Sequence, residues 1–524
     1  MDPFRTVPAA QAAGERGSLI RGWIEDAAAR HGGDVYLADA RGKATLTYAG
    51  LLDVVRETER RLDEAGLPRG ARVSVRLADP LGYAAALVAL IAAGRVAVPL
   101  DPEAPDFDIA RVRAVARPAG LVIGGPVIGG TAIGGTVIGG TVIGGTGPGD
   151  GIMAAGGAAT PSFGITAFDL SPVTAGTGGG GIFLCTSGTT GTPKGILLRE
   201  AQLAHVASSV ADWHRLSRDD RGYCSLPLFH VNAEVVGVLA TLRAGAYLAV
   251  DRKFSRRGFW DLISAERITW INAVPAIISI LAMDPPARPP ARLRFVRSAS
   301  APLPLAALER FERAVGVPVI ETYGMTEAAS MITANPIDGP RKPGSAGRPA
   351  GTQVRVGLPG GRAATAGEMG RVQIRGAGVI TTYASGGRPG VIDDEGWLDT
   401  GDLGYLDADG YLFLAGRSDD VINRGGEKIY PREIEEILLA QPGVRSAAVV
   451  GRTDEVLGMR PVAYVVPEHG APAGEIEQAL RAACARHLPR HKQPSEFWLL
   501  DEMPLGPTGK ISRRVLKESV TAQP

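Results

Sequence analysis

The stretch VSVRLADPLGYAAALVALIAAGRVAVPL, residues 73–100, predicts the fold class of this chain. Residues 73–77 and 96–100 are rich in valine and leucine, as buried strands are, and the Ala/Leu-rich residues 83–93 between them predict a helix. Upstream, residues 49–65 predict another helix that ends at Gly66. A helix that connects two apolar strands favours a parallel sheet. We therefore expect an α/β protein.

Length and charge exclude several classes of protein. The chain has 524 residues, with 56 Lys and Arg against 55 Asp and Glu, for a formal net charge of +1. At roughly 100–200 residues per domain, this length predicts two to four units that bury a core without disulfides. The balanced charge lacks the basic surface of a nucleic-acid or anionic-membrane binder. We expect neither partner, and a small-molecule substrate instead.

The cysteines and the N-terminus indicate where the protein works. Cys185, Cys224 and Cys484 have no spacing for zinc or a redox pair, so each is expected to be a reduced core residue. The N-terminus lacks the pattern of a signal peptide. The longest apolar helical stretch, residues 84–93, falls well short of the roughly 20 residues that span a bilayer. The expected location is the cytoplasm.

The glycine content of the chain is unusually high and unevenly distributed. Glycine occupies 70 of 524 positions, about 13% against an average near 7%. Residues 122–146 are five pentads of the type VIGGT, and a looser Gly/Ala/Thr stretch continues to residue 181. A β-solenoid or a nucleotide loop is the functional alternative, but five residues are too few for a full coil. We favour a low-complexity surface insert over residues 122–181.

The second half of the chain predicts a change of architecture and a domain boundary. Residues 366–416 carry β-branched residues and glycine turns, which indicates smaller antiparallel sheets. Residues 417–524 predict a compact unit with helices near 431–440 and 473–487 and strands at 446–450 and 461–466. We therefore expect an N-terminal domain, residues 1–416, and a small C-terminal domain, residues 417–524.

The strongest chemical pattern is Thr186-Ser-Gly-Thr-Thr-Gly-Thr-Pro-Lys-Gly195, directly after the apolar residues 182–185. Its glycines let backbone N–H groups approach a phosphate, its hydroxyls donate hydrogen bonds and its lysine supplies charge. Pro193 stands where a Walker A loop needs glycine. The alternative is an ordinary hydroxyl-rich turn. The ATP-binding candidates here are Thr186, Ser187, Gly188, Thr189, Thr190, Gly191 and Lys194.

This pattern resembles the phosphate loop of the adenylate-forming superfamily, which includes acyl-CoA synthetases, peptide-synthetase adenylation domains and luciferases. Four further segments match that family in its order: ETYGMTE (321–327), GWLDTGD (396–402), GRSDD with NRGGEK (416–428) and PTGK (507–510). The resemblance covers nearly the whole chain, from residue 45 to 517. The resemblance implies a large N-terminal domain of parallel α/β sheets with a small distorted β-barrel. It also implies a small, mobile α+β C-terminal domain that rotates between two half-reactions.

The resemblance assigns nucleotide roles to particular residues. Tyr323, next to Gly324, would stack on adenine, and Thr326 would bond the α-phosphate of ATP. Glu327 would hold the Mg²⁺ that neutralises the phosphates. Asp402 would accept the ribose hydroxyls, with Arg417 as a second ribose contact. The alternative for Glu327 and Asp402 is a solvated turn carboxylate.

Lys510 is the expected catalytic cation. When a carboxylate attacks the α-phosphorus of ATP, two anions approach each other, and an ammonium that touches both stabilises the transition state. The hinge would lie at Ser418-Asp419, so that the C-terminal domain can turn after adenylation. The resemblance implies that this movement presents an acceptor face to the thiol of CoA or of a carrier-protein pantetheine: Arg424, Gly425, Gly426 and Lys428.

The sequence indicates the substrate less clearly than it indicates the nucleotide site. The resemblance places six residues along the acyl pocket: His230, Asn232, Glu234, Arg297, Ser298 and Ser300. Adenylation domains for α-amino acids usually have Asp at the position of His230, which argues against an amino acid. The segments 294–300 and 328–335 look most like oxalyl-CoA and other small-acid synthetases, which tend to have histidine at the positions of Asn232 and Ala329. Core packing is the alternative for His230, and a helix face away from the pocket is the alternative for Glu234.

Three functions remain open at this stage. The leading one is an ATP- and Mg²⁺-dependent acid–CoA ligase for a small or aromatic carboxylate. The alternative keeps adenylation but uses a nitrogen acceptor, as an amide synthetase or as a diazotase of secondary metabolism that activates nitrite for an aryl amine. A non-catalytic nucleotide-binding protein is the weakest, because Glu327, Asp402, Arg417 and Lys510 are all present. A monomer or a homodimer is expected.

Overall fold

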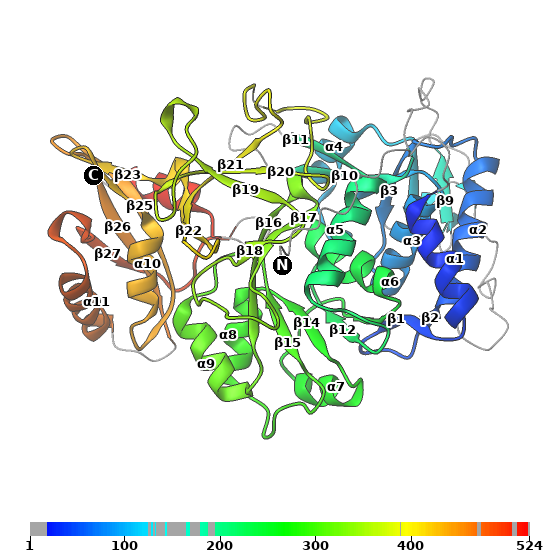
Figure 1. Ribbon diagram of the computed structural model, residues 1–524, viewed down its shortest axis with the longest axis horizontal. Helices are drawn as coiled ribbons and strands as arrows, with labels where there is room; N and C mark the ends of the chain where they lie inside the picture. Colours follow the sequence, from blue (N-terminus) through cyan, green and yellow to red (C-terminus); the bar gives the residue numbers. More distant parts are fainter. Residues whose placement is uncertain are drawn as a thin grey trace. The chain divides into compact units, whose positions relative to one another are not determined.

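The computed structural model describes residues 18–123, 127–128, 131–132, 142–143, 164–167, 179–186, 194–387, 389–468, 473–505 and 511–521 (Figure 1). Backbone contacts divide the chain into two compact units. Unit 1 comprises residues 1–272, 326–330 and 377–388, and unit 2 comprises residues 273–325, 331–376 and 389–524. The expected boundary between residues 416 and 417 stays a prediction.

A mixed sheet in unit 1 confirms the strand–helix–strand prediction. The strand β3 (Arg72–Arg76), the helix α3 (Pro80–Ala92) and the strand β4 (Val96–Pro99) occupy the predicted positions, and β3 pairs with β4 in parallel. The strands of this sheet run in the order β11-β10-β4-β3-β5-β9-β8. The remaining members are β5 (Gly120–Ile123), β8 (Val142–Ile143), β9 (Gly164–Ala167), β10 (Gly181–Thr186) and β11 (Lys194–Arg199).

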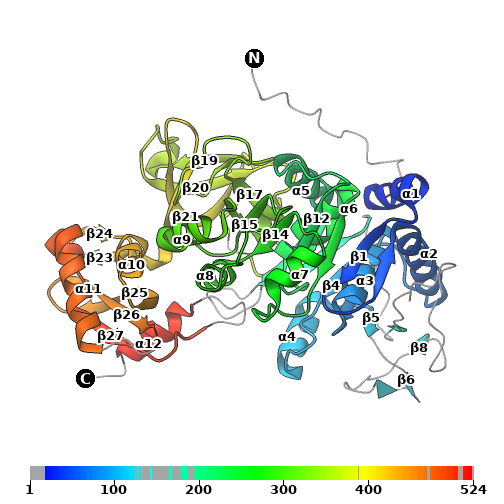
Figure 2. The same cartoon turned by 90° about the horizontal axis from the view of Figure 1, so that it is seen from below.

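The helix α3 is buried on every side. From Leu81 to Ala92 every residue is buried, and none of the apolar side chains is more than 2% exposed. A helix that is apolar all round belongs inside a protein rather than on its surface. Figure 2 shows α3 beside the helices α1 (Leu19–His31) and α2 (Tyr48–Glu64), which pack against it. Asp79 caps its N-terminus by accepting a hydrogen bond from the Gly82 N–H.

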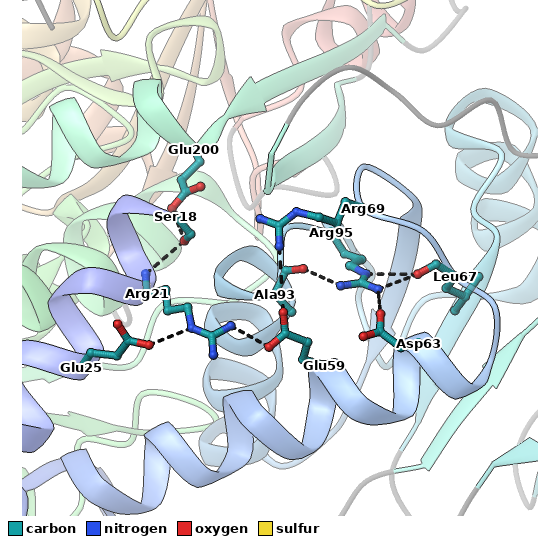
Figure 3. Close-up of polar contacts among 10 residues, drawn as sticks. All are labelled: Ser18, Arg21, Glu25, Glu59, Asp63, Leu67, Arg69, Ala93, Arg95 and Glu200. Atoms are coloured by element: carbon teal, nitrogen blue, oxygen red, sulfur yellow. Dashed lines mark hydrogen bonds and ion pairs between the residues drawn. The ribbon is translucent and has the colours of Figure 1, made fainter. Parts of the chain in front are cut away.

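The buried guanidinium of Arg95 lies just after α3, where it bonds to residues at the end of α2 and beyond it (Figure 3). Arg95 is 2% exposed, and it donates to the Ala93 carbonyl at 2.6 Å and to the Leu67 carbonyl at 2.7 Å. It also pairs with the Asp63 carboxylate of α2. These hydrogen bonds and the ion pair compensate the guanidinium for lost contact with water, so its burial costs less free energy than that of an unpaired charge.

A second sheet in unit 1 is also largely parallel. The strand β13 pairs in parallel with β1 and with β12, and β12 pairs in parallel with β14. The strand β2 adds an antiparallel edge. The bounds are β1 Val35–Asp39, β2 Thr45–Thr47, β12 Arg221–Cys224, β13 Tyr247–Val250 and β14 Trp270–Ala273. The helices of this region are α4 Asp106–Ala116, α5 Glu200–Trp213, η1 Asn232–Leu239, α6 Ala240–Ala244 and α7 Phe259–Ala265.

Unit 2 contains an antiparallel sheet over residues 366–416, as expected, with one further strand, β19, before that stretch. Its strands are ordered β19-β20-β21-β22, and each adjacent pair is antiparallel. Their bounds are β19 Gln353–Gly357, β20 Gly370–Arg375, β21 Leu398–Leu406 and β22 Leu412–Arg417. The parallel pair β15 and β16 and the antiparallel pair β17 and β18 precede it, with α8 and α9. These elements are α8 Pro275–Met283, β15 Phe295–Ser298, α9 Leu305–Val315, β16 Val319–Met325, β17 Ser330–Ala334 and β18 Arg348–Pro349.

The C-terminal part of unit 2 has the predicted helices and strands. Figure 1 shows the helices α10 and α11 beside the strands β25, β26 and β27. Buried side chains of Ile434, Leu438, Val449, Val465 and Leu480 join these elements in one hydrophobic core. The bounds are β23 Ile422–Arg424, β24 Glu427–Ile429, α10 Pro431–Leu439, β25 Val444–Asp454, β26 Gly458–Pro467, α11 Ala473–His487, β27 Glu496–Leu499 and α12 Arg513–Thr521.

Most of the predicted insert at residues 122–181 lies outside the described residues. Of its described parts, β9 pairs with both β5 and β8, so the segment contributes strands to the sheet of unit 1. Cys224 and Cys484 are buried as expected, whereas Cys185 is half-buried beside a small apolar cluster. Among the described helices, none combines the length and the apolar character that a bilayer crossing requires.

Candidate active site

The predicted phosphate loop connects two paired strands. Thr186 ends β10, Lys194 begins β11, and these two residues pair across the antiparallel ladder. Ser187, Gly188, Thr189, Thr190 and Gly191 lie outside the described residues. The ladder therefore holds Thr186 and Lys194, the residues on either side of residues 187–193, next to each other. Their contacts with phosphate stay a prediction.

Glu327 is a buried carboxylate with one hydrogen bond. It is 8% exposed, and its Oε1 accepts a hydrogen bond from the Tyr383 hydroxyl at 3.0 Å. Within the described residues no hydrogen bond reaches its Oε2. Thr326 precedes it in the same short 3₁₀ turn. Residues 377–387 carry no spaced pattern that marks Tyr383, and only the fold brings it to Glu327.

Mg²⁺ fits this carboxylate. The ion is usually held by one or two protein carboxylates together with phosphate oxygens and water, rather than by a cage of protein ligands. In the part of the chain that the structure describes, no group of three or more His, Cys, Asp or Glu could hold a metal ion. A single buried carboxylate with an uncommitted oxygen is therefore the arrangement that a nucleotide-bound Mg²⁺ needs.

Tyr323, Asp402 and Arg417 form a hydrogen-bonded cluster in unit 2. The Tyr323 hydroxyl donates to Asp402 Oδ2 at 2.5 Å, and Arg417 Nη1 lies 3.3 Å from Asp402 Oδ1. Arg417 also donates to the Thr400 carbonyl at 2.8 Å. Burial, and then the Asp402 charge, raise the pKa of Tyr323 well above its ordinary value, so the phenol stays a donor. Gly324 follows Tyr323 and is exposed. The three nucleotide candidates thus meet, whereas their contacts with adenine and ribose stay predictions.

Glu321 begins the same motif and is expected to make stability depend on pH. It is 7% exposed, and burial raises its pKa from 4.5 to about 7, although the Gly344 N–H donates to it at 3.1 Å. The folded state therefore holds this proton more tightly than the unfolded state. The contribution of the protonated Glu321 to the free energy of unfolding is fully present below about pH 4.5. It is lost as the pH rises through 7, and the loss is roughly 3 kcal/mol at most.

Replacement of Glu321 tests this expectation. The Glu321→Gln variant cannot ionise, so its melting temperature should rise relative to the wild type as the pH increases from 5 to 8. Thermal unfolding followed by fluorescence at each pH measures the difference. The exposed Glu475→Gln is the control and should show no such trend. A Glu321→Gln difference that stays constant over this range contradicts the expectation.

The acyl-pocket candidates occur in both units. His230 is half-buried, its ring packs on Phe229, and it lies just before the π-helix η1 that contains Asn232. The Asn272 amide reaches Asn232 Oδ1 at 3.5 Å. These residues follow or end the parallel strands β12 and β14, and the carboxyl ends of such strands are where ligands bind in α/β sheets.

In unit 2, the other acyl-pocket candidates also lie at the carboxyl end of a parallel strand. Arg297 and Ser298 are buried at the end of β15. Ser300 follows with φ of 73°, in the left-handed region that favours glycine. Side chains held in this region cost free energy and concentrate at functional sites. The pocket role of all six candidates stays a prediction.

Glu234 differs from its neighbours on η1. It is 0% exposed, and neither carboxyl oxygen has a hydrogen-bond partner among the described residues. Residues that are two positions apart in a π-helix are separated by nearly half a turn. Glu234 and Asn232 therefore lie on different faces of η1. Burial, and then the charge of Glu234, raise the pKa of Tyr83 on α3 well above its ordinary value, and burial raises the pKa of Glu234 itself well above its ordinary value. These contacts support the helix face away from Asn232 that was the alternative for this residue.

Replacement of Glu234 by an apolar residue should therefore stabilise the protein. An unpartnered buried polar group costs about 1–3 kcal/mol, and leucine removes that cost with little change in volume. We expect Glu234→Leu to raise the melting temperature at pH 8 and to leave adenylation within about twofold of the wild type. Glu234→Gln cannot ionise but keeps an unpartnered polar group, so it should stabilise the protein less than Glu234→Leu does. A large loss of activity in a stable Glu234→Leu variant would instead place this side chain in the pocket.

The predicted acceptor face is a tight hairpin. Arg424 pairs with Glu427 across β23 and β24, and Gly425 and Gly426 form the two-residue turn with φ of 60° and 92°. A two-residue turn with positive φ at both positions requires residues such as glycine, so the hairpin alone accounts for both. Arg424 donates to the His491 carbonyl at 2.6 Å, and Lys428 is exposed. Approach of a pantetheine to this turn stays a prediction.

The hinge candidate lies within the described residues, and the catalytic candidate lies outside them. Asp419 lies in the 3₁₀ turn Ser418–Asp420. Lys510 lies outside the described residues, but Leu505 and Ile511 on either side of residues 506–510 form a β-bridge. The roles of Asp419 and Lys510 stay predictions.

Comparison with known proteins identifies close similarities over most of the chain. Residues 24–147 and 181–384 match the model of the AMP-binding enzyme family, and residues 433–510 match that of the AMP-binding enzyme C-terminal domain. A sulfoacetate–CoA ligase of Cupriavidus necator is 44% identical over 63% of this chain and 65% of its own length. An oxalate–CoA ligase of Arabidopsis thaliana is 38% identical over 66% of this chain and 68% of its own length.

A solved structure extends the similarity to the fold. The o-succinylbenzoate CoA synthetase of Bacillus subtilis, in complex with its acyl-adenylate intermediate, is similar with a TM-score of 0.76 and 27% identity. The comparison covers 94% of this chain and 97% of that one. The similarity confirms the α/β fold class, in which a large N-terminal and a smaller C-terminal domain are combined.

Proposed function

The chain belongs to the adenylate-forming superfamily of AMP-binding enzymes, and from this premise we propose that it is an AMP-forming acid–CoA ligase for a small or aromatic carboxylate. Glu327 carries the proposal: it is a buried carboxylate in a family motif, and within the described residues Tyr383 is its one hydrogen-bond partner. Such a group fits a Mg²⁺ ion held between protein and triphosphate. Relatives that are sulfoacetate– and oxalate–CoA ligases support a small acid.

The proposed reaction has two steps. In the first, a carboxylate oxygen of the substrate attacks the α-phosphorus of ATP, and the bond to pyrophosphate breaks. Lys510 would contact the carboxylate and the α-phosphate, and Thr326 would bond the α-phosphate. Glu327 would hold a Mg²⁺ ion, which would supply positive charge against the phosphates. In the second, the thiolate of CoA attacks the acyl carbon, the thioester forms and AMP leaves with the electron pair.

The described residues support this division of roles. Tyr323, Asp402 and Arg417 form a polar cluster that presents a carboxylate with both oxygens already oriented, as a ribose contact requires. The hinge at Asp419 would allow the C-terminal domain to serve the second step with the Arg424–Lys428 face. The cytoplasm as location and a monomer or homodimer as assembly stay predictions.

The test is pyrophosphate release measured over a panel of acids. The panel contains sulfoacetate, oxalate, 2-succinylbenzoate, benzoate and nitrite, each with and without CoA and an aryl amine, and mass spectrometry identifies the product. The proposal expects at least one carboxylate to yield AMP and an acyl-CoA. Turnover only with nitrite and amine would favour the nitrogen-acceptor alternative. Absence of any pyrophosphate release from folded protein contradicts both.

A further inference from the structure

A loop that sequence analysis left unassigned joins two segments of the candidate active site. In unit 1, the Gly195 N–H of β11 donates to the Ser385 carbonyl at 3.0 Å, and the Ala384 N–H donates back to the Gly195 carbonyl at 2.9 Å. The Ile380 N–H donates to the Glu327 carbonyl at 2.9 Å. The loop of residues 377–387 is therefore bonded through its backbone to the strand after the predicted phosphate loop and to the Glu327 turn.

One side chain of this loop contacts both charged candidates. The Tyr383 hydroxyl donates to Glu327 Oε1 at 3.0 Å, and Lys194 Nζ lies 5.3 Å from the centroid of the Tyr383 ring. An ammonium at this distance from an aromatic ring is attracted by the electron density of its face. The hydroxyl and the ring of Tyr383 thus act on two different groups, an anion and a cation.

The hydrogen bond from Tyr383 fixes the orientation of the Glu327 carboxylate, and a metal ligand benefits from a fixed orientation. An ionised carboxylate accepts only, and with the Tyr383 hydroxyl on Oε1, Oε2 accepts no hydrogen bond from the residues that the structure describes. Mg²⁺ demands near-octahedral geometry, so a ligand that is already oriented loses less freedom on binding. Groups that orient a metal ligand typically contribute about 10–100-fold to metal affinity.

We propose that Tyr383 is a positioning residue for MgATP, whose hydroxyl orients Glu327 toward the metal and whose ring steadies Lys194 beside the phosphates. The inference rests on the proposed function, in which Glu327 holds Mg²⁺ and Lys194 binds phosphate. Tyr383 itself touches neither metal nor substrate in this arrangement.

The test separates the hydroxyl from the ring. Tyr383→Phe keeps the ring and removes the hydroxyl, so calorimetry should show the Kd for MgATP increased by about 10-fold, with the Kd for AMP unchanged. Tyr383→Leu also removes the ring, so it should in addition weaken binding of ATP in excess EDTA, because Lys194 is no longer steadied. Melting temperatures of both variants are measured in parallel.

The chain offers a matched control on another element, the strand β13. In unit 1, the Tyr247 hydroxyl donates to Glu266 Oε2 at 2.6 Å, and the Arg221 guanidinium lies 3.5 Å from the Tyr247 ring centroid. Tyr247→Phe therefore removes the same kind of hydrogen bond and keeps the same kind of ring–cation contact. It should leave the Kd for MgATP unchanged.

The outcomes distinguish this inference from the proposed function. If Glu327→Gln weakens MgATP binding but Tyr383→Phe binds as the wild type does, the positioning role is wrong and the proposed function stands. If Glu327→Gln has no effect either, the metal role of Glu327 is wrong. Equal weakening of AMP and MgATP in Tyr383→Phe, or a similar effect in Tyr247→Phe, shows a general structural effect and overturns the inference.

Discussion

Lys510→Ala is expected to lower carboxylate-dependent pyrophosphate release by about 10²–10³-fold, which corresponds to roughly 2.7–4 kcal/mol of transition-state stabilisation. The reason is that two anions, the substrate carboxylate and the α-phosphate, approach each other in this step, and the ammonium is the expected group between them. Loss of the charge leaves that repulsion uncompensated. Stopped-time assays of pyrophosphate with the best acid of the panel measure the effect.

Two further measurements make this result specific. Thioester formation from a synthetic acyl adenylate and CoA should decrease far less in Lys510→Ala, because no phosphorus is attacked in that step. Arg514→Ala, which removes a neighbouring exposed cation that pairs with Glu518 on α12, should keep both half-reactions. A Lys510→Ala enzyme that retains half of its pyrophosphate release would contradict the catalytic role.

Glu327→Gln is expected to lower adenylation by on the order of 100-fold, together with a higher Mg²⁺ requirement. Glutamine keeps the size of the side chain and an oxygen that can accept from the Tyr383 hydroxyl, but it removes the negative charge. The Mg²⁺ concentration at half-maximal rate, determined at saturating ATP, should therefore increase. The fold itself should change little, because the residue forms no ion pair among the described residues.

Glu266→Gln is the matched control for this variant. Glu266 also accepts from a tyrosine hydroxyl, Tyr247, but in addition it pairs with Arg221 at 3.0 Å, so its charge is already compensated. Its replacement should leave the Mg²⁺ requirement unaltered. An unchanged Mg²⁺ requirement in Glu327→Gln would remove the proposed metal ligand and, with it, the main support for MgATP chemistry at this turn.

Local patterns predicted the elements of the fold well. The strand–helix–strand unit of residues 73–100 became β3, α3 and β4 because apolar periodicity and capping are properties of neighbouring residues. The same holds for α10 and α11 in the C-terminal part. Prediction was poorer in the Gly-rich insert, where β9 pairs with β5, because a short segment of small residues carries no signal of which strand it joins.

The sequence by itself determined the fold class, the family and the identity of the charged candidates, since each is a matter of composition, periodicity or short motifs. Only the tertiary structure decided which of those groups meet. The Tyr383 hydroxyl reaches Glu327 across 56 positions, and the Tyr323 hydroxyl reaches Asp402 across 79. Likewise, only the tertiary structure shows that Glu234 is buried beside α3, which distinguishes it from Asn232 on the same helix η1. Hydrogen bonds and desolvation depend on distance in space, and spacing along a chain does not fix that distance.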